Sequence, residues 1–343
     1  MAKRILYGVL NWGLGHASRS AVIIKELERK GFQPVIASDG LALEYLRREF
    51  PRLESRELPP YGVSYSKGNN QWPSLIASLP KIAVAAKKEK QLVEYWAEED
   101  GFSGVISDNR LGFFHSETPS VYLSHQLRPL AGMFTSVAKR AHAKFYKHYQ
   151  QIWVPDTPLS TLSGKLSKIK HPGLRYIGPI STLKQTDHKR GDKILVVLSG
   201  PEPQRTILET QIFEQAESYK DELVVVRGTN TSCDSRYQKE FKVFDLLGSE
   251  DLSRLIAESK LVVSRSGYSS IMDYYHLGKQ ALLIPTPGQT EQEYLAKSLK
   301  ANGYFHTVSQ SKLQLKEDVE KALAHPCLEA QDNKLPEDLF SLF

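Results

Sequence analysis

The sequence predicts an α/β protein built from two doubly wound domains, each around a parallel sheet. Short apolar runs alternate with amphipathic helical patterns, which is typical of strand–helix–strand units. The alternation stops at a polar stretch without periodicity and then starts again, and 343 residues suit about two domains. We therefore expect a first domain over 1–180, a linker over 181–192, a second domain over 193–325 and a C-terminal tail over 326–343. Two such domains predict a cleft between them.

The first domain opens with the order strand, tight turn, helix, strand. Residues 4–10 are an apolar run that ends in a glycine-rich turn, and residues 16–30 carry an apolar stripe at helical spacing. Gly31 ends this helix, and residues 34–38 read as the second strand. Apolar runs predict further strands over 104–107, 120–124 and 151–154.

The second domain repeats this pattern after the linker. Its predicted strands are 193–198, 223–227, 261–264 and 281–284. Its predicted helices are 206–219, 251–258, 269–277 and 291–300.

Composition narrows the class of protein. Hydrophobic residues make up 41% and charged residues 24%, which excludes long disorder. The two cysteines, Cys233 and Cys327, are far apart, so we expect neither a disulfide scaffold nor a cysteine zinc site. The most apolar long stretch, 74–86, is too short to cross a bilayer, and the N-terminus lacks a signal peptide. These features predict a cytoplasmic protein, and the net charge of +6 favours an anionic partner.

The first turn that could bind a ligand or take part in catalysis is Gly-Leu-Gly-His, residues 13–16. Gly13 and Gly15 would let a ligand approach the backbone, and the helix start offers N–H donors to an anion. It is not the dinucleotide fingerprint, because Ser18 stands where that motif needs glycine. The alternative is a tight turn in which His16 caps the helix.

The equivalent turns of the second half are also candidates. Arg205 follows a proline-rich loop and could bridge to a phosphate, or it could be a surface arginine. Ser269 and Ser270 open a helix and could hold a phosphate, while Asp273 lies one turn on, where a carboxylate could bind a ribose. Their alternative role is plain capping.

A fourth turn, 285–290, leads into a helix that begins near Glu291 and Gln292. A carboxylate and an amide side by side suit sugar hydroxyls. The alternative is a capping box of Thr290 and Glu293. All four turns follow predicted strands, and open α/β sheets bind ligands at the carboxyl ends of their strands.

The second half resembles the donor-binding half of the MurG family, the N-acetylglucosaminyltransferases of peptidoglycan synthesis. The resemblance rests on the runs VVSRSGYSSIMD and GKQALLIPTPGQTEQEYLA, in which the family pattern matches Arg265, Gly267, Ser270, Gln292 and Ala296. Asp273 stands where the family has the glutamate that holds the ribose, and Leu295 replaces an asparagine. The family has the GT-B fold, two Rossmann-like domains facing a cleft.

The first half resembles the family more loosely. Residues 13–16 are similar to its glycine-rich loop, and residues 123–126 followed by Gly132 are similar to its His-Glu-Gln-Asn stretch. The form GLGHxxR is closer to a subgroup of uncharacterised MurG-like transferases. It is also similar to the nucleotide-sugar hydrolase of pseudaminic acid synthesis, whose histidine activates water.

The resemblance implies a metal-independent, inverting glycosyltransferase that uses a UDP-sugar as substrate and needs no cofactor. N-acetylglucosamine is the sugar it favours. We expect His16 as general base, because neutral imidazole can take a hydroxyl proton at pH 7; the alternatives are a phosphate-holding role and a hydrolase in which His16 activates water. Arg19 and His125 are expected on the acceptor side. The residues expected to bind the donor are Gly13, Gly15, Arg205, Leu246, Leu247, Arg265, Gly267, Ser269, Ser270, Asp273, Glu291 and Gln292.

Two further patterns bear on whether the protein binds a membrane or a nucleic acid. Trp72, Leu75, Ile76, Leu79 and Ile82, followed by Lys87, Lys88 and Lys90, form an apolar series edged by lysines. This pattern is typical of a segment that lies in a membrane interface, and the alternative is a core helix. The resemblance to the MurG family also implies a lipid-linked or glycan acceptor. Residues 136–175 carry eight Lys and Arg against Asp156 alone, but no interleaved stacking aromatics, so we expect no nucleic-acid partner.

Overall fold

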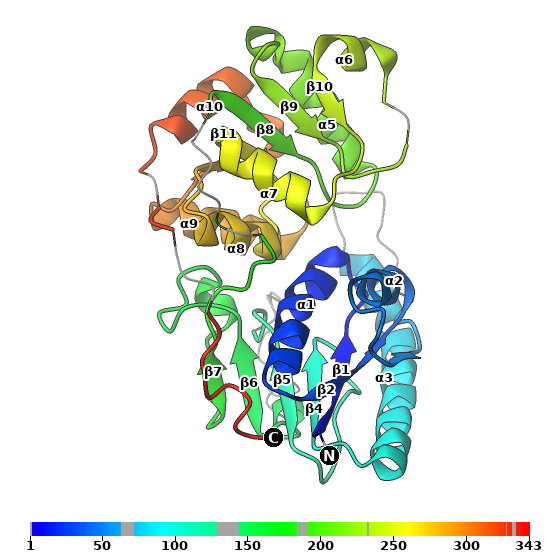
Figure 1. Cartoon of the computed structure of the whole chain (residues 1–343). Helices are drawn as coiled ribbons and strands as arrows, with labels where there is room; N and C mark the ends of the chain where they lie inside the picture. Colours follow the sequence, from blue (N-terminus) through cyan, green and yellow to red (C-terminus); the bar gives the residue numbers. More distant parts are fainter. Residues whose placement is uncertain are drawn as a thin grey trace. The chain divides into compact units, whose positions relative to one another are not determined.

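The structure is a computed structural model, and it consists of two α/β units. It describes residues 2–62, 72–128, 144–183, 185, 191–231, 233–326, 328–330 and 334–343. The first unit contains the described residues up to 182 together with 334–343, and the second contains those from 183 to 330. Each unit has one parallel sheet, which confirms the predicted fold class (Figure 1).

The first unit is built on a seven-stranded sheet in the order β3-β2-β1-β4-β5-β6-β7. Residues of β1 pair in parallel with both β2 and β4, and Val9 at the end of β1 lies opposite Asp108 at the end of β4. The turns that follow these two strands therefore meet at one edge of the sheet. The strands are β1 Arg4–Val9, β2 Gln33–Ser38, β3 Ser55–Glu57, β4 Gly104–Asp108, β5 Ser120–Leu123, β6 Gln151–Val154 and β7 Leu174–Tyr176.

The helices whose backbone the structure describes in full in this unit are α1 Leu14–Arg29, α2 Gly40–Glu49 and α3 Trp72–Asp100, with a short 3-10 helix, η2, at Gly164–Leu166. Val93 and Ala97 of α3 lie four residues apart and so share one helix face. They pack against Leu6, Val35 and Val105, which line one face of the sheet. Because this core is fully buried, the sheet edge that carries the β1 and β4 turns rests on a rigid support.

The C-terminal residues belong to the first unit, which no sequence signal indicates. Phe340 packs edge-on against Phe32 and Trp153, with ring centroids 5.9 and 5.8 Å apart. Phe343 lies so close to Gly104 that a Cβ added there would be 2.2 Å from its ring. Glycine at the start of β4 is therefore required by the tail.

The second unit is built on a six-stranded sheet in the order β10-β9-β8-β11-β12-β13. Helices α5 and α10 pack on one face of it through an apolar cluster that includes Leu208, Ile212 and Val319, and α7, α8 and α9 lie on the opposite face (Figure 1). The strands are β8 Lys193–Val197, β9 Leu223–Val226, β10 Lys242–Phe244, β11 Ser259–Ser264, β12 Ala281–Leu283 and β13 His306–Thr307. The helices are α5 Gln204–Gln215, η3 Glu217–Tyr219, α6 Ser235–Glu240, α7 Ser249–Glu258, α8 Tyr268–His276, α9 Thr290–Ala301, η4 Gln310–Lys312 and α10 Leu315–Leu323.

Most predicted elements occur within one to three residues of their predicted bounds. The predicted helix 206–219 is instead divided, because α5 ends at Gln215 and a separate 3-10 turn, η3, follows. The elements that the sequence did not predict include α2, the edge strands β3, β7 and β10, and α10. Short edge strands carry little apolar patterning, since one side of each has no neighbouring strand.

The lysine-edged segment lies in α3, and only part of it falls within the described side chains. Trp72, Leu75 and Ile76 lie outside them. Ile82 is in the core with Leu10 and Tyr61, so its assignment to a membrane-facing surface is wrong. Leu79 is 53% exposed and Val84 is 58% exposed. None of the described helices combines the length and apolar character needed to span a bilayer.

Candidate active site

His16 lies in the first turn of α1, immediately after β1. The helix begins two residues earlier than predicted, at Leu14, so His16 is a helical residue and not its cap. The N-cap is Gly13, whose φ of 77° favours glycine and which offers no side chain to the helix N–H groups. Among the described residues, none lies within 4 Å of a Cβ added at Gly13. A ligand can therefore approach this turn closely.

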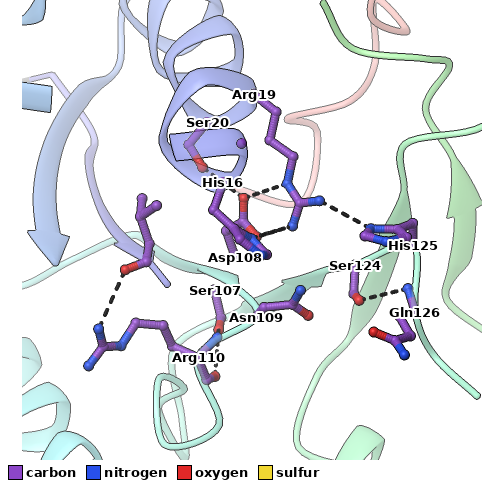
Figure 2. Close-up of polar contacts among 12 residues, drawn as sticks. His16, Arg19, Ser20, Ser107, Asp108, Asn109, Arg110, Ser124, His125 and Gln126 are labelled. Atoms are coloured by element: carbon purple, nitrogen blue, oxygen red, sulfur yellow. Dashed lines mark hydrogen bonds and ion pairs between the residues drawn. The ribbon is translucent and has the colours of Figure 1, made fainter. Parts of the chain in front are cut away.

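Asp108, at the end of β4, lies directly beside His16. The Nδ1 atom of His16 is 2.8 Å from Oδ1 of Asp108 (Figure 2). The Asp108 side chain is fully buried, and that of His16 is 13% exposed. Sequence reasoning missed Asp108, although an acidic residue directly after the predicted strand 104–107 was the available signal. A carboxylate that holds one ring nitrogen leaves the other to act as a base.

Arg19 and Ser20 complete the shell around the Asp108 carboxylate. Arg19 donates from Nε to Oδ2 at 2.8 Å and from Nη2 to Oδ1, and Ser20 Oγ donates to Oδ2 at 2.8 Å. Nη2 of Arg19 is also 2.8 Å from Nδ1 of His16, and Nη1 is 3.2 Å from Nδ1 of His125. The structure thus brings together three of the predicted residues, His16, Arg19 and His125, around one buried carboxylate (Figure 2).

The electrostatics of this cluster follow from burial and from Arg19. Burial lowers the pKa of His16, the positive charge of Arg19 lowers it further, and Asp108 opposes both. Burial alone would raise the pKa of Asp108, but the charges of Arg19 and His16 outweigh it and hold that pKa far below its usual range. At neutral pH the site therefore contains a neutral imidazole beside an ionised carboxylate.

The loop after Asp108 is fixed by a second buried network. Asn109 adopts the left-handed conformation with φ of 58° and accepts from the hydroxyl of Tyr122 at 3.0 Å. Arg110 is fully buried; it donates to Asp39 at 2.5 Å and to Glu89. Glu89 also accepts from Tyr61 at 2.7 Å. These bonds hold the end of β4, and so Asp108, in one position.

In the second unit, the predicted serines lie at the N-terminus of α8. Its N-cap is Gly267, which makes no side-chain cap bond. Among the described residues, nothing lies within 4 Å of a Cβ added at Gly267. Ser269 and Ser270 occupy the first turn and are partly exposed, and Asp273 lies one turn on. The N–H groups of a helix start attract phosphate, and the phosphate contact of these serines stays a prediction.

Two buried polar atoms near α8 have no partner among the described residues. Arg265 donates to the backbone oxygens of Gln204 at 2.6 Å and Pro285 at 3.2 Å, but its Nε makes no bond. Burial lowers the pKa of Arg265 to about 10. The Oγ1 of Thr286 is likewise unbonded and lies 3.8 Å from a Cβ placed on Gly200. Unsatisfied buried groups are costly, and either water or a polar ligand can satisfy them.

Arg205 is not in the setting predicted for it. It is 3% exposed and donates to Glu202 at 2.5 Å and to Glu209, which also accepts from Arg227 at 2.7 Å. Glu202 in turn accepts from the backbone N–H of Thr206 at 3.2 Å. A carboxylate therefore occupies the start of α5, and the phosphate contact of Arg205 stays a prediction.

The remaining predicted residues lie at the ends of β10 and β12. Gln292 bonds within its own turn, accepting from the N–H of Thr286 at 2.9 Å and donating to Gln289 at 2.6 Å. Thr290 does not cap α9, since the N-cap is Gln289. Three further predicted residues are at least partly accessible to solvent. Glu291 and Leu247 are half-buried, and Leu246 is 54% exposed. No group of three or more His, Cys, Asp or Glu side chains in the described part of the chain is placed to hold a metal ion.

Comparison with known proteins agrees with this arrangement. Residues 195–338 match the glycosyltransferase family 28 C-terminal domain, and residues 3–126 match glycosyl transferase family 1. A relative from Caldicellulosiruptor saccharolyticus, "UDP-N-acetylglucosamine--N-acetylmuramyl-(pentapeptide) pyrophosphoryl-undecaprenol N-acetylglucosamine transferase", is 27% identical over 150 residues. That match covers 38% of this chain and 40% of the relative, so it spans less than half of the relative's length.

Solved structures share the whole fold. The glycotransferase of kitacinnamycin superposes with a TM-score of 0.70 at 17% identity, covering 95% of this chain and 92% of that one. The calicheamicin glycosyltransferase CalG4 gives 0.66 at 15%, covering 94% and 90%. MurG of Acinetobacter baumannii gives 0.59 at 13%, covering 94% and 91%.

The two parallel-sheet units therefore have the GT-B fold that these glycosyltransferases share. Within this fold, residues 195–338 resemble the family 28 C-terminal domain, and the chain as a whole is similar in fold to MurG.

Proposed function

We propose that this protein transfers a sugar from a UDP-sugar to an acceptor hydroxyl, with inversion and without a metal ion. The observation that carries the proposal is the 2.8 Å contact between His16 Nδ1 and the buried Asp108 carboxylate. Such a pair orients a neutral imidazole for proton abstraction. The resemblance to MurG and the name of the Caldicellulosiruptor relative support UDP-N-acetylglucosamine as donor.

The reaction uses His16 as its base. With the Nδ1 proton donated to Asp108, the Nε2 lone pair takes the proton of the acceptor hydroxyl. The acceptor oxygen then forms its bond to the anomeric carbon of the sugar. The bond from that carbon to the phosphate oxygen breaks, and its electron pair leaves with UDP. Attack from the side opposite the diphosphate gives inversion.

The donor is proposed to bind at the second unit through the α8 turn. The uncapped helix start at Ser269 and Ser270 would stabilise the leaving diphosphate, and Arg265 would add positive potential. Asp273 would bind the ribose, Glu291 and Gln292 the sugar, and Leu246 and Leu247 the base. Helix N–H groups can carry this charge without a metal ion, and no cofactor is proposed.

The acceptor side is proposed to include a membrane. The name of the Caldicellulosiruptor relative gives that protein a substrate on pyrophosphoryl-undecaprenol, and a lipid-linked or glycan acceptor would suit this chain. The exposed Leu79 and Val84, next to the exposed Lys87 and Lys88, offer a surface for peripheral contact at the cytoplasmic face. A nucleic-acid partner is not part of the proposal.

A panel of nucleotide sugars tests the donor assignment. Specific binding at 100 times Kd stabilises a protein by about 2.7 kcal/mol, so UDP-N-acetylglucosamine should raise the melting temperature, with UDP alone as the reference ligand. If only sugars on another nucleotide stabilise the protein, the donor assignment is wrong. Product analysis separates the hydrolase alternative, because free sugar released without any acceptor would mean that His16 activates water.

A further inference from the structure

Arg19 lies where it can act on His16 directly. The two residues are three apart in α1 and so lie on the same helix face. The Nη2 atom of Arg19 is 2.8 Å from Nδ1 of His16, and it also donates to the Asp108 oxygen that His16 contacts. Arg19 is 3% exposed, so its guanidinium is enclosed by protein.

We propose that Arg19 is a positioning residue that controls how firmly His16 holds a proton, and that it does this through its charge and its clamp on Asp108. The inference rests on the proposed role of His16 as base. It assigns to Arg19 a task different from the acceptor contact expected from the sequence.

The charges around His16 support this assignment. The groups that face it are Arg19 of its own helix, Asp108 of β4 and His125 after β5, with Tyr7 of β1 next to Asp108. Burial and Asp108 raise the pKa of the Tyr7 hydroxyl, so Tyr7 is neutral. With His16 neutral, Arg19 and Asp108 cancel, and a proton on His16 creates net positive charge in a buried cluster.

An isolated histidine–aspartate pair behaves in the opposite way. A carboxylate alone raises the pKa of its histidine, because it stabilises the imidazolium. Burial, together with the charge of Arg19 that offsets the carboxylate, leaves the pKa of His16 below its usual value. His16 then stays deprotonated into mildly acidic solution and releases a captured proton readily. This effect is Coulombic, so it holds whichever nitrogen of His16 carries the proton.

The test is titration of the His16 ring by long-range ¹H–¹⁵N NMR on the full-length free protein, with the resonance assigned from the spectrum of His16→Gln. Arg19→Gln should move the His16 midpoint upward by about one pH unit or more, as loss of a like charge at this separation does. Arg19→Lys should keep it near the parent value, and Asp108→Asn should move it downward. Arg29→Gln, in the last turn of the same helix and 66% exposed, is the matched control and should change nothing.

The titration midpoints test the role of Arg19 without any measurement of sugar transfer. An unchanged midpoint in Arg19→Gln, or an equal movement in Arg19→Lys, overturns it. If Arg19→Gln fails to fold, the double variant Arg19→Gln with Asp108→Asn removes the uncompensated carboxylate. Its midpoint should lie above that of Asp108→Asn alone, and equality would overturn the proposal. A displaced midpoint in a protein that transfers no sugar would leave the role of Arg19 intact and reject the proposed function.

Discussion

His16 and Asp108 are 92 positions apart in the chain, yet Nδ1 of one lies 2.8 Å from Oδ1 of the other. Two features produce this contact. The parallel register of β1 and β4 places Val9 opposite Asp108, and α1 begins soon enough after β1 for its first turn to lie over the end of β4. The sheet, rather than any local motif, thus assembles the proposed base and its carboxylate.

Replacing His16 by alanine should lower turnover by about 10²- to 10⁴-fold, the usual contribution of a general base. Donor affinity should change little, because the donor is proposed to bind through the second unit. Steady-state kinetics with saturating donor measure the first effect, and calorimetric titration with UDP measures the second. Loss of donor binding with unchanged turnover would show that His16 positions the ligand instead.

Asp108→Asn should lower turnover to a similar extent, by about 10²- to 10⁴-fold, while keeping the shape of the site. The amide no longer selects the Nδ1–H tautomer, and it removes the charge that stabilises the imidazolium. Ser20→Ala is the matched control, since it deletes one hydrogen bond to Asp108 without altering charge. The interpretation fails if the control loses as much activity as Asp108→Asn.

Acid should weaken the first unit through His16 and Asp108. The pKa of His16 is lowered in the folded protein, so below about pH 6.5 the unfolded chain binds the proton more strongly and stability falls. Asp108, whose folded pKa is also lowered, loses its contribution as pH falls below about 4. Urea unfolding between pH 4 and 7 should show less pH dependence in His16→Ala than in the parent. Equal slopes of the unfolding free energy against pH in the two proteins would contradict the lowered pKa of His16.

Asp273→Ala should weaken binding of UDP and UDP-sugars without unfolding the protein, because a ribose contact is lost. Loss of a hydrogen bond to a charged group costs about 1.5–3 kcal/mol, roughly 10- to 150-fold in Kd. Asp251→Ala, on the exposed surface of α7, provides a matched carboxylate control. Unchanged UDP affinity by calorimetry would reject the ribose assignment.

Vesicles test the proposed membrane contact. The protein should sediment with vesicles of acidic lipid, be released by high salt, and bind less when Lys87, Lys88 and Lys90 become serine, at about 1 kcal/mol per lysine near the surface. Lys90 should contribute least, because it is already paired with Glu94. Replacing the exposed Lys316 and Lys321 of α10 is the control. Protein that remains in the supernatant under every condition indicates an acceptor outside the membrane.

The sequence by itself determined the fold class and the strand-to-helix turns on which the candidate residues lie. Apolar runs such as 193–198 and 281–284 must be buried on both faces, so they specify parallel strands. Glycine at residues 13 and 267 marks the places where a helix starts close behind a strand, and these signals are local. His16 could therefore be selected from the sequence, and so could Ser269, Ser270 and Asp273.

The tertiary structure alone decided which side chains meet. Asp108 has no local motif, and it lies beside His16 only because β4 is the neighbour of β1. Arg205 has the spacing of a phosphate ligand, but folding places Glu202 and Glu209 against it. Ile82 fits an apolar helix stripe, but its packing against Leu10 puts it in the core. Periodicity reports which residues are buried, whereas the partners of a buried charge depend on strand order and register, which bring distant residues together.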